Sequence, residues 1–160
     1  MKYLTFHLNE LYLGIAAAEV LEVNRGFQIT PVPKSPAMVQ GIANLRGEII
    51  LAIDMHARFE IERKRLTPQA IGVILHCKRM MIAAIVDQVG DIIELYEDTF
   101  ELPPSNFPEA SRELILGVHK LPDRLMLIVD SQKIWSDAPA TVPGLNQIEG
   151  ELTPFLRIAH

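Results

Sequence analysis

One stretch of this sequence occurs twice, and the duplication constrains the fold more than any other feature. The segment GIANLRGEIILAIDMHARF (residues 41–59) aligns without gaps with GVHKLPDRLMLIVDSQKIW (residues 117–135), at an offset of 117 − 41 = 76 residues. A glycine, a turn, an apolar run, an aspartate and an aromatic residue recur in the same order. Residues 3–20 and 71–89 correspond more loosely. Two matches in one order indicate a duplicated architecture; chance similarity between apolar strands is the alternative.

The apolar runs in both halves are short and are separated by turn-forming residues, which favours β-strands over helices. Asn9-Glu10 and Lys78-Arg79 each separate two such runs, as the turn of a two-residue β-hairpin does. The strands predicted around these turns are Tyr3–Leu8, Leu11–Ile15, Ile71–Cys77 and Met80–Val86. We expect residues 73–75 and 80–86 to be buried on both faces, because their apolar residues are consecutive.

Proline-rich segments connect the strands within each half. TPVPKSP (residues 30–36) and ELPPSNFPEAS (residues 101–111) are predicted to be extended connections, because proline has no backbone N–H to donate within a sheet. The number and spacing of the strands predict an all-β fold of two small barrels with about five strands each. Residues 1–136 then form one domain with two pseudo-repeat halves. Residues 137–160 form a C-terminal extension that docks on the body or on a second copy, or is loosely ordered.

Composition disfavours several classes of partner and location. The formal net charge is −5 and the only basic cluster is the short run at residues 63–65, which disfavours nucleic acid. Cys77 is the only cysteine, which excludes an intramolecular disulfide and a Cys-x-x-Cys site. The longest purely apolar run, residues 80–86, is far shorter than the roughly 20 residues that span a bilayer. Residues 1–13 lack the apolar core of a signal peptide. We expect a soluble, cytoplasmic protein without direct membrane insertion.

The sequence contains none of the common motifs of catalysis or cofactor binding. No two histidines have the i, i+4 spacing of a helical metal site, and His-Glu-x-x-His is absent. The nucleophile elbow Gly-x-Ser-x-Gly, the phosphate loop and Gly-x-Gly-x-x-Gly are absent as well. Carboxylates are numerous but lie at strand ends and turns, where solvation explains them. We expect no metal, no cofactor and no enzymatic activity, although a catalytic carboxylate pair is not excluded by sequence.

The turn between the two apolar runs of residues 41–59 is the best candidate for binding a partner. Asn44 and Gly47 are residues that turns favour, and Leu45 can anchor the turn in the core. Arg46 would then point outward in a defined direction, so little side-chain entropy is lost when it binds a carboxylate or a carbonyl. The alternative is that Arg46 only keeps the turn soluble or pairs with Glu48.

Two further groups of residues have a predicted role. Strand alternation places Val20 on the same face as Glu22, which suits either an interface patch or a half-buried strand. Asp54 and Asp130 each follow a strand and precede a helix-permissive stretch, so we expect their carboxylates to cap the first free N–H groups.

The quoted segments resemble the CheW family of bacterial chemotaxis coupling proteins. The family signature is similar to GIANLRGEIILAIDMHARF, and MMIAAIVDQVGDIIEL and ILGVHKLPDRLMLIVDSQKIW resemble later family segments. The resemblance covers about Tyr3 to Trp135. The sequence departs from the pattern at Asp54-Met55-His56, where Asp-Leu-Arg is commoner, and this leaves the output pathway open.

The resemblance implies two intertwined, five-stranded SH3-like barrels and an adaptor without catalytic activity. It implies two partners, the cytoplasmic tip of chemoreceptors and the regulatory domain of a CheA-type histidine kinase, and therefore association with membrane receptor arrays. The residues it places at partner contacts are Val20, Glu22, Gly41, Asn44, Leu45, Arg46 and Gly47. Receptor binding is expected between the barrels and kinase binding at an exposed barrel end. The competing hypothesis is a small-molecule-binding or catalytic β-barrel that shares only the topology.

Overall fold

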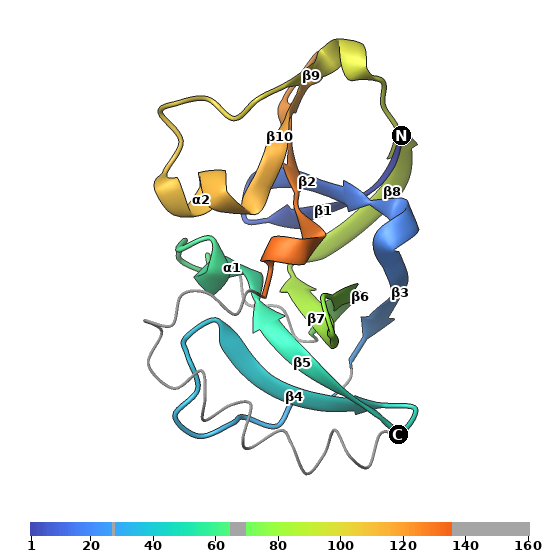
Figure 1. The fold of residues 1–160 in the computed structure, drawn as a ribbon, viewed down its shortest axis with the longest axis vertical. Helices are drawn as coiled ribbons and strands as arrows, with labels where there is room; N and C mark the ends of the chain where they lie inside the picture. Colours follow the sequence, from blue (N-terminus) through green and yellow to red (C-terminus); the bar gives the residue numbers. More distant parts are fainter. Residues whose placement is uncertain (27, 65–69, 136–160) are drawn as a thin grey trace.

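Two β-sheets lie one above the other in Figure 1, the larger at the top. The computed structural model describes residues 1–26, 28–64 and 70–135; the predicted extension, residues 137–160, lies outside the described residues. The six-stranded sheet has the order β8 (Gln88–Glu94), β1 (Lys2–Leu8), β2 (Leu11–Ala16), β11 (Leu125–Val129), β10 (Ile115–Lys120) and β9 (Phe100–Glu101). The five-stranded sheet has the order β3 (Val20–Arg25), β6 (Ile71–Cys77), β7 (Met80–Val86), β5 (Glu48–Asp54) and β4 (Val39–Leu45).

Helical segments in the described residues are short and lie between strands. The two α-helices are α1 (Met55–Arg58) and α2 (Glu109–Leu114), and the three 3₁₀ turns are η1 (Ala17–Glu19), η2 (Glu97–Thr99) and η3 (Ser131–Lys133). The predicted all-β class is confirmed. Two details differ from the prediction. One sheet has six strands, and the hydrogen-bonded order of each sheet ends at edge strands instead of closing into a barrel.

Helix α2 contradicts the prediction that residues 101–111 are entirely extended. Its N-cap residue is Pro108, and the helix begins at Glu109, inside the proline-rich segment. The proline ring favours the first turn of a helix as readily as an extended chain, because its missing N–H has no partner there in either case. The extended interpretation fails before the last proline as well, because residues 105–107 form a turn in which the Phe107 N–H donates to the Pro104 carbonyl at 3.1 Å.

Each sheet contains strands from both halves of the chain. The hairpin β1–β2 of the first half pairs with β8 and β11 of the second, and the hairpin β6–β7 of the second half pairs with β3 and β5 of the first. Both junctions with β11 and β5 are parallel, and Leu13 faces Leu127 as Ile82 faces Leu51. Exchanging equivalent strands converts one sheet order into the other, apart from β9, as the duplication predicts. The halves are intertwined.

The largest hydrophobic cluster lies between the sheets and takes residues from both. Val73 and Leu75 of β6 point into this shared core, whereas Ile74 packs in a second cluster that belongs to the five-stranded sheet alone. All three side chains are buried. In β7, residues 82–86 are also buried, and only Met80 and Met81 are half-buried. The prediction that these strands bury both faces is therefore confirmed for all but the start of β7.

Polar contacts between the halves follow the same pattern twice. In the turn after β1, the N–H of Asn9 donates to the Asp87 carboxylate at 2.7 Å, and His56 lies 3.0 Å from the same oxygen. In the turn after β6, the N–H of Lys78 donates to the side-chain oxygen of Gln132 at 2.8 Å. Asp87 follows β7 of the five-stranded sheet and binds a turn of the six-stranded sheet, whereas Gln132 follows β11 of the six-stranded sheet and binds a turn of the five-stranded sheet. These two contacts hold the sheets together.

Candidate partner-binding surface

The predicted turn is a two-residue β-hairpin loop between β4 and β5. Leu45 pairs with Glu48, so Arg46 and Gly47 form the loop, and both have positive φ angles, 51° and 85°. Two positive φ angles in succession define a type I′ turn, whose twist matches that of the strands. The Asn44 side chain accepts a hydrogen bond from the Gly47 N–H at 3.0 Å. Leu45 is half-buried against the cluster of the five-stranded sheet and anchors the loop.

Arg46 is exposed but held in one direction by an ion pair. Its guanidinium lies 2.5 Å from the Glu22 carboxylate on β3, while 71% of the side chain remains accessible. The hydrogen bond with Glu22 is the main cause that raises the pKa of Arg46, and Glu48 contributes less. The partner is therefore Glu22, not the neighbouring Glu48 that the sequence suggested as the alternative. A left-handed backbone at an arginine costs roughly 1 kcal/mol relative to an unstrained conformation. Arg46 therefore lowers the stability of the turn that exposes it.

A shallow hollow lies beside this ion pair. Its volume is about 140 Å³, and its walls include Leu21, Ile74 and Met81 in addition to the two charged residues. Leu21 is among the few large apolar side chains that are exposed. Figure 1 places the β4–β5 hairpin at the end of the five-stranded sheet that faces away from the six-stranded sheet. Arg46 therefore does not line the space between the sheets, where the resemblance implies receptor binding.

The prediction that Val20 and Glu22 share a face is wrong. The pairing of β3 with β6 shifts between these residues, from Val20–Leu75 to Glu22–Ile74. Val20 consequently packs against the shared core, and Glu22 faces the hollow on the opposite side. A β-bulge adds one residue to a strand and reverses its alternation from that point on. Val20 is half-buried and does not line the hollow.

Gly41 is buried and packs against backbone, so it presents no contact surface of its own. A Cβ built on Gly41 would lie 2.2 Å from the carbonyl oxygen of Thr30, and its φ of 153° disfavours other residues. Gly117, at the duplicated position, has the same surroundings, with the Glu101 carbonyl oxygen 2.5 Å from such a Cβ. The absence of a side chain at both glycines therefore lets the backbone of a neighbouring segment of the same chain lie close to the bulged strand, β4 or β10.

The two aspartates at the strand ends cap the segments that follow. Asp54 accepts hydrogen bonds from the N–H groups of His56 and Ala57 at the start of α1, and Asp130 accepts one from Gln132 in η3. Arg63 also lies 3.3 Å from Asp54. These contacts are local, and neither aspartate lies near the Arg46 hairpin.

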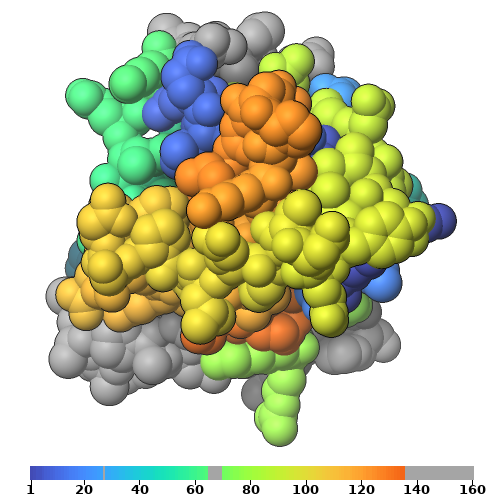
Figure 2. Space-filling view, turned by 90° about the horizontal axis from the view of Figure 1, so that it is seen from above, coloured from blue at the N-terminus to red at the C-terminus, as the bar shows by residue number. Residues whose placement is uncertain are grey.

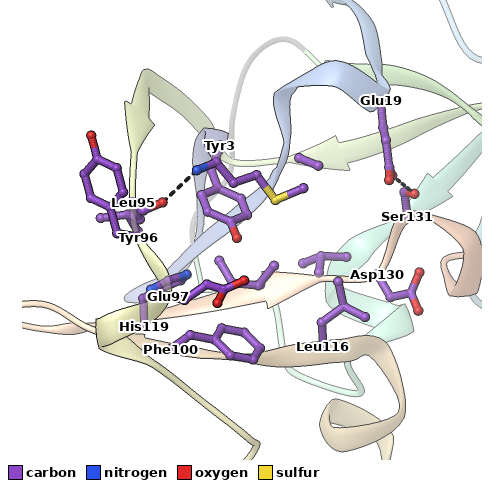
Figure 3. Close-up of a pocket in the computed structure, with 14 residues that line it drawn as sticks. Tyr3, Glu19, Leu95, Tyr96, Glu97, Phe100, Leu116, His119, Asp130 and Ser131 are labelled. Carbon is purple, nitrogen blue, oxygen red and sulfur yellow. Dashed lines mark hydrogen bonds between the residues drawn. The ribbon is translucent and has the colours of Figure 1, made fainter.

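A larger pocket, which sequence reasoning did not find, opens in the six-stranded sheet. Its volume is about 380 Å³, and Figure 3 shows its side chains converging from the start of β1, the end of β8, β10 and β11. Tyr3, Phe100, Leu116 and Ile128 form apolar walls. Residues from so many separate segments carry no common sequence signal, which is why the pocket could be seen only in three dimensions. The hydrogen bond from the Met1 amino group to the Leu95 carbonyl, 2.8 Å long, joins two of these segments.

The surroundings shift the pKa values of ionisable side chains in this pocket, among them Glu19 and His119. Removal from water, and next the Asp130 carboxylate, raise the pKa of Glu19, whose carboxylate is hydrogen-bonded by the Ser131 hydroxyl. Burial, and next the N-terminal ammonium, lower the pKa of His119 below its ordinary value. His119 contacts the rings of Tyr3 and Phe100 edge-on, and Thr99 lies 2.8 Å from its Nδ1. The histidine is therefore neutral at pH 7.

The described residues contain neither a cluster of metal ligands nor a membrane-spanning helix. In the parts of the chain that the structure describes, no group of three His, Cys, Asp or Glu side chains is arranged to hold a metal ion. Within those same segments, no helix is long and apolar enough to cross a membrane. The described surface includes a charged, oriented hairpin with a hollow beside it and a separate, mainly apolar pocket.

Comparison with known proteins gives consistent matches along nearly the whole described chain. A family model for the CheW-like domain matches residues 2–139. The chemotaxis protein CheW of Treponema pallidum is 31% identical over 136 residues, which cover 82% of this chain and 80% of that protein. Protein FrzA of Myxococcus xanthus is 26% identical over 117 residues, 73% of this chain and 72% of its own length. The crystal structure of the scaffolding protein TtCheW from Thermoanaerobacter tengcongensis superposes with a TM-score of 0.77, at 27% identity, covering 89% of this chain and 97% of that one.

Proposed function

This chain belongs to the CheW-like family, and from that premise we propose that it is a non-catalytic adaptor that couples chemoreceptors to a CheA-type histidine kinase. In this proposal residues 1–136 form the adaptor domain. It is cytoplasmic, and it reaches the membrane only through the receptors. The observation that carries the proposal is the Arg46 hairpin, because a strained, exposed and oriented arginine has no evident benefit for the fold.

The hairpin provides the chemistry that a protein partner requires. The ion pair with Glu22 holds the guanidinium in place before binding, so less side-chain entropy is lost in the complex. Guanidinium groups bind carboxylates and carbonyls through several donors at once. The hollow beside it, with Leu21 exposed at its edge, supplies apolar contact area. The resemblance implies partner contact at Arg46, and Arg46 lies outside the space between the sheets, so in this proposal the receptor contacts the far end of the five-stranded sheet. The kinase then binds a different part of the molecule.

Binding measurements with both partners test the proposal. The full chain should bind the purified kinase regulatory domain and a purified receptor cytoplasmic fragment with micromolar or tighter affinity, measured by titration calorimetry. Arg46→Glu should weaken receptor binding about tenfold, which is about 1.4 kcal/mol, and should leave kinase binding and the circular dichroism spectrum unchanged. A chain that binds neither partner would contradict the proposal.

Lys78→Glu is a matched control for this variant. Lys78 is also exposed, occupies the first position of a two-residue hairpin turn and has a positive φ of 56°. The same charge change is therefore made at another hairpin position with positive φ, on a different surface. Receptor binding should stay within twofold of the wild type. Equal loss in both variants would show a general effect of net charge and would remove the assignment of Arg46.

A double reversal separates binding from support of the fold. If the ion pair only stabilises β3 against the hairpin, Glu22→Arg combined with Arg46→Glu should restore receptor binding. If the receptor requires a cation at position 46, the double variant should remain weak. We expect the second result.

The competing hypothesis of a small-molecule-binding barrel has one observation in its favour, the pocket with the raised pKa of Glu19 beside Asp130. We place it second because the Glu19 carboxylate already has a hydrogen-bond partner in Ser131 and the walls are mainly apolar. Binding of a small molecule in that pocket, together with failure to bind both proteins, would reverse this order.

A further inference from the structure

The pocket of the six-stranded sheet has the size and the lining of a small-molecule site. Its volume of about 380 Å³ lies within the range of ligand cavities, roughly 300–1,000 Å³. Tyr3, Phe100 and Ile128 supply apolar walls, and polar side chains stand among them. Figure 2 views the molecule from the side of this sheet, where the orange segment of β10–β11 lies beside the yellow-green segment of β8 and η2. Residues from both segments line the pocket.

The charged side chains in the wall of the pocket are all acidic. The described residues that line it include Glu19, Glu97 and Asp130 but no lysine or arginine. Among the same residues the Met1 amino group is the only cation, and it already donates to the Leu95 carbonyl at 2.8 Å. The pocket therefore has an excess of negative charge. A cleft lined by charge of one sign attracts ligands of the opposite sign.

Glu19 and Asp130 form the part of the pocket that best suits an ammonium group. Removal from water, and next repulsion from Asp130, raise the pKa of Glu19, so the two carboxylates lie close enough to repel each other. Among the described residues, one oxygen of each has a donor, the Ser131 hydroxyl for Glu19 and the Gln132 N–H for Asp130. The other oxygen of each has none there. An ammonium group carries three N–H donors, so it can bind both free oxygens and remove the repulsion.

A buried nitrogen elsewhere in the pocket lacks a hydrogen-bond partner. His119 is 2% exposed, and its Nε2 atom has no partner among the described residues. The Thr99 hydroxyl donates to the Tyr96 carbonyl at 3.3 Å, so Nδ1 of the neutral histidine donates to the Thr99 oxygen at 2.8 Å. Nε2 is left with a free lone pair, and an unpaired buried polar atom is unfavourable. Figure 3 shows His119 and Glu19 on opposite sides of the pocket, so one ligand with two donor groups can satisfy both.

We propose that this pocket binds a small organic amine. The ammonium group lies between Glu19 and Asp130, the apolar body packs against Tyr3 and Phe100, and a second donor group of the ligand reaches Nε2 of His119. The inference goes beyond the proposed function, because it adds a small ligand to an adaptor and does not depend on which proteins the adaptor binds. The pocket and the Arg46 hairpin belong to different sheets, so an amine and a protein partner can be bound at once.

Two probes that differ only in charge test the ammonium site. Tyramine carries a phenol and an ammonium group, and desaminotyrosine carries the same phenol with a carboxylate in place of the ammonium. Each is titrated into the full chain and followed by nuclear magnetic resonance. Tyramine should bind saturably and shift the signals of Ser131 and His119, whereas desaminotyrosine should bind at least tenfold more weakly. Equal affinity of the two probes, or no saturable binding of tyramine, would overturn the proposal.

Phenethylamine, which is tyramine without the phenol hydroxyl, tests the second donor. It should bind the wild-type chain about threefold more weakly than tyramine, because it offers nothing to Nε2 of His119. His119→Phe should remove this difference while leaving the affinity for phenethylamine within twofold. Equal binding of the two amines by the wild-type chain would overturn the role given to His119.

Glu19→Gln and Glu94→Gln are matched variants for the acidic pair. Both replace an exposed glutamate in or next to the six-stranded sheet, but Glu94 does not line the pocket. Glutamine can still accept the hydrogen bond from Ser131, so the first change removes mainly the charge. Glu19→Gln should weaken tyramine binding about fivefold, and Glu94→Gln should change it by less than twofold. Thermal unfolding verifies that both variants are folded. Equal effects would show a general influence of net charge and would overturn the assignment of Glu19.

The outcomes separate this inference from the proposed function. If the wild-type chain binds the receptor fragment, the kinase domain and tyramine, the protein is an adaptor that also holds a ligand. If it binds both proteins but neither amine, the inference alone is overturned. If it binds tyramine at the pocket but neither protein, the proposed function fails and the inference stands.

Discussion

The hairpins β4–β5 and β10–β11 occupy equivalent places in the duplicated architecture, yet they end differently. The first closes with Arg46 and Gly47, both with positive φ, and its arginine pairs with Glu22. The second closes with a longer loop, in which the Leu121 N–H donates to the Arg124 carbonyl and the Arg124 guanidinium lies 3.6 Å above the Tyr12 ring. The strands below the loops repeat the same bulge and the same packed glycine. Duplication has preserved the interior of each sheet, while the exposed ends have diverged.

The glycines should respond most strongly to mutation, because they belong to the repeated interior. Gly41→Ala should destabilise the protein by roughly 3 kcal/mol, since the new Cβ meets the Thr30 backbone at 2.2 Å with an unfavourable φ. Gly117→Ala should cost somewhat less, because Gly117 lacks the positive φ of Gly41, although its Cβ would also meet backbone, the Glu101 carbonyl oxygen at 2.5 Å. Urea unfolding of the two variants measures the difference. Equal costs would show that both positions relax in the same way.

Arg46→Asn tests whether the first hairpin sacrifices stability for its exposed arginine. Asparagine is favoured at the first position of a type I′ turn, so relief of strain should contribute about 1 kcal/mol. Loss of the exposed ion pair with Glu22 should remove about 0.5 kcal/mol of that gain. We expect a small net increase in unfolding free energy together with weaker receptor binding. A clear loss of stability would contradict the view that this arginine is kept for binding.

Arg124→Gln is the corresponding change in the second hairpin and should have a smaller effect. It removes the contact with the Tyr12 ring, which for an exposed pair contributes about 0.5 kcal/mol. Receptor binding should be unchanged, since the loop lies on the other sheet. Reduced receptor binding would show that the two hairpins act together, against the assignment of the receptor to the five-stranded sheet proposed above.

The smallest perturbation is a single proton on His119. Ala43 occupies the equivalent position in the five-stranded sheet (119 − 43 = 76), so this position carries a titratable side chain only in the six-stranded sheet. Burial lowers the pKa of His119 in the folded state below its ordinary value of 6.5. The unfolded chain therefore binds the proton more readily, and stability should fall as the pH drops below about 6.5.

Nuclear magnetic resonance titration of the His119 ring in the folded protein measures this directly. The midpoint should lie below that of an unfolded peptide containing the same residues. Urea unfolding at pH 7 and pH 5.5 should show a smaller decrease in His119→Gln than in the wild type. A folded-state midpoint above 6.5 would contradict the sign of the prediction.

Local chemistry made much of the fold predictable from sequence. The hairpin turns after β1 and β6, the two-sided burial of Val73, Ile74 and Leu75, and the turn at Asn44 and Gly47 all depend on residues close in the chain. The same is true of the Asp54 and Asp130 caps, whose hydrogen bonds reach only a few residues ahead.

Features that depend on register or on distant partners were not predictable in the same way. The bulge in β3 reversed the expected facing of Val20 and Glu22, and no residue type in that stretch requires a bulge. The ion pair of Arg46 joins the β4–β5 hairpin to β3, which lies at the opposite edge in the order of the five-stranded sheet, so a nearer candidate, Glu48, was equally reasonable from sequence. The acidic pocket required segments from both ends of the chain to meet, which only the assembled sheets define.

The exchange of strands between the halves has a consequence during synthesis on the ribosome. When the first half has emerged, its strands β3 and β5 lack the hairpin β6–β7 against which they pair, and β1 lacks β8. The five-stranded sheet can be completed only once β7, in the second half, has been translated, and the six-stranded sheet only once β11, the last strand, has followed. A truncated product should therefore remain unfolded and be cleared by proteolysis, and splitting the gene between the halves should yield a functional adaptor only when both fragments are produced together.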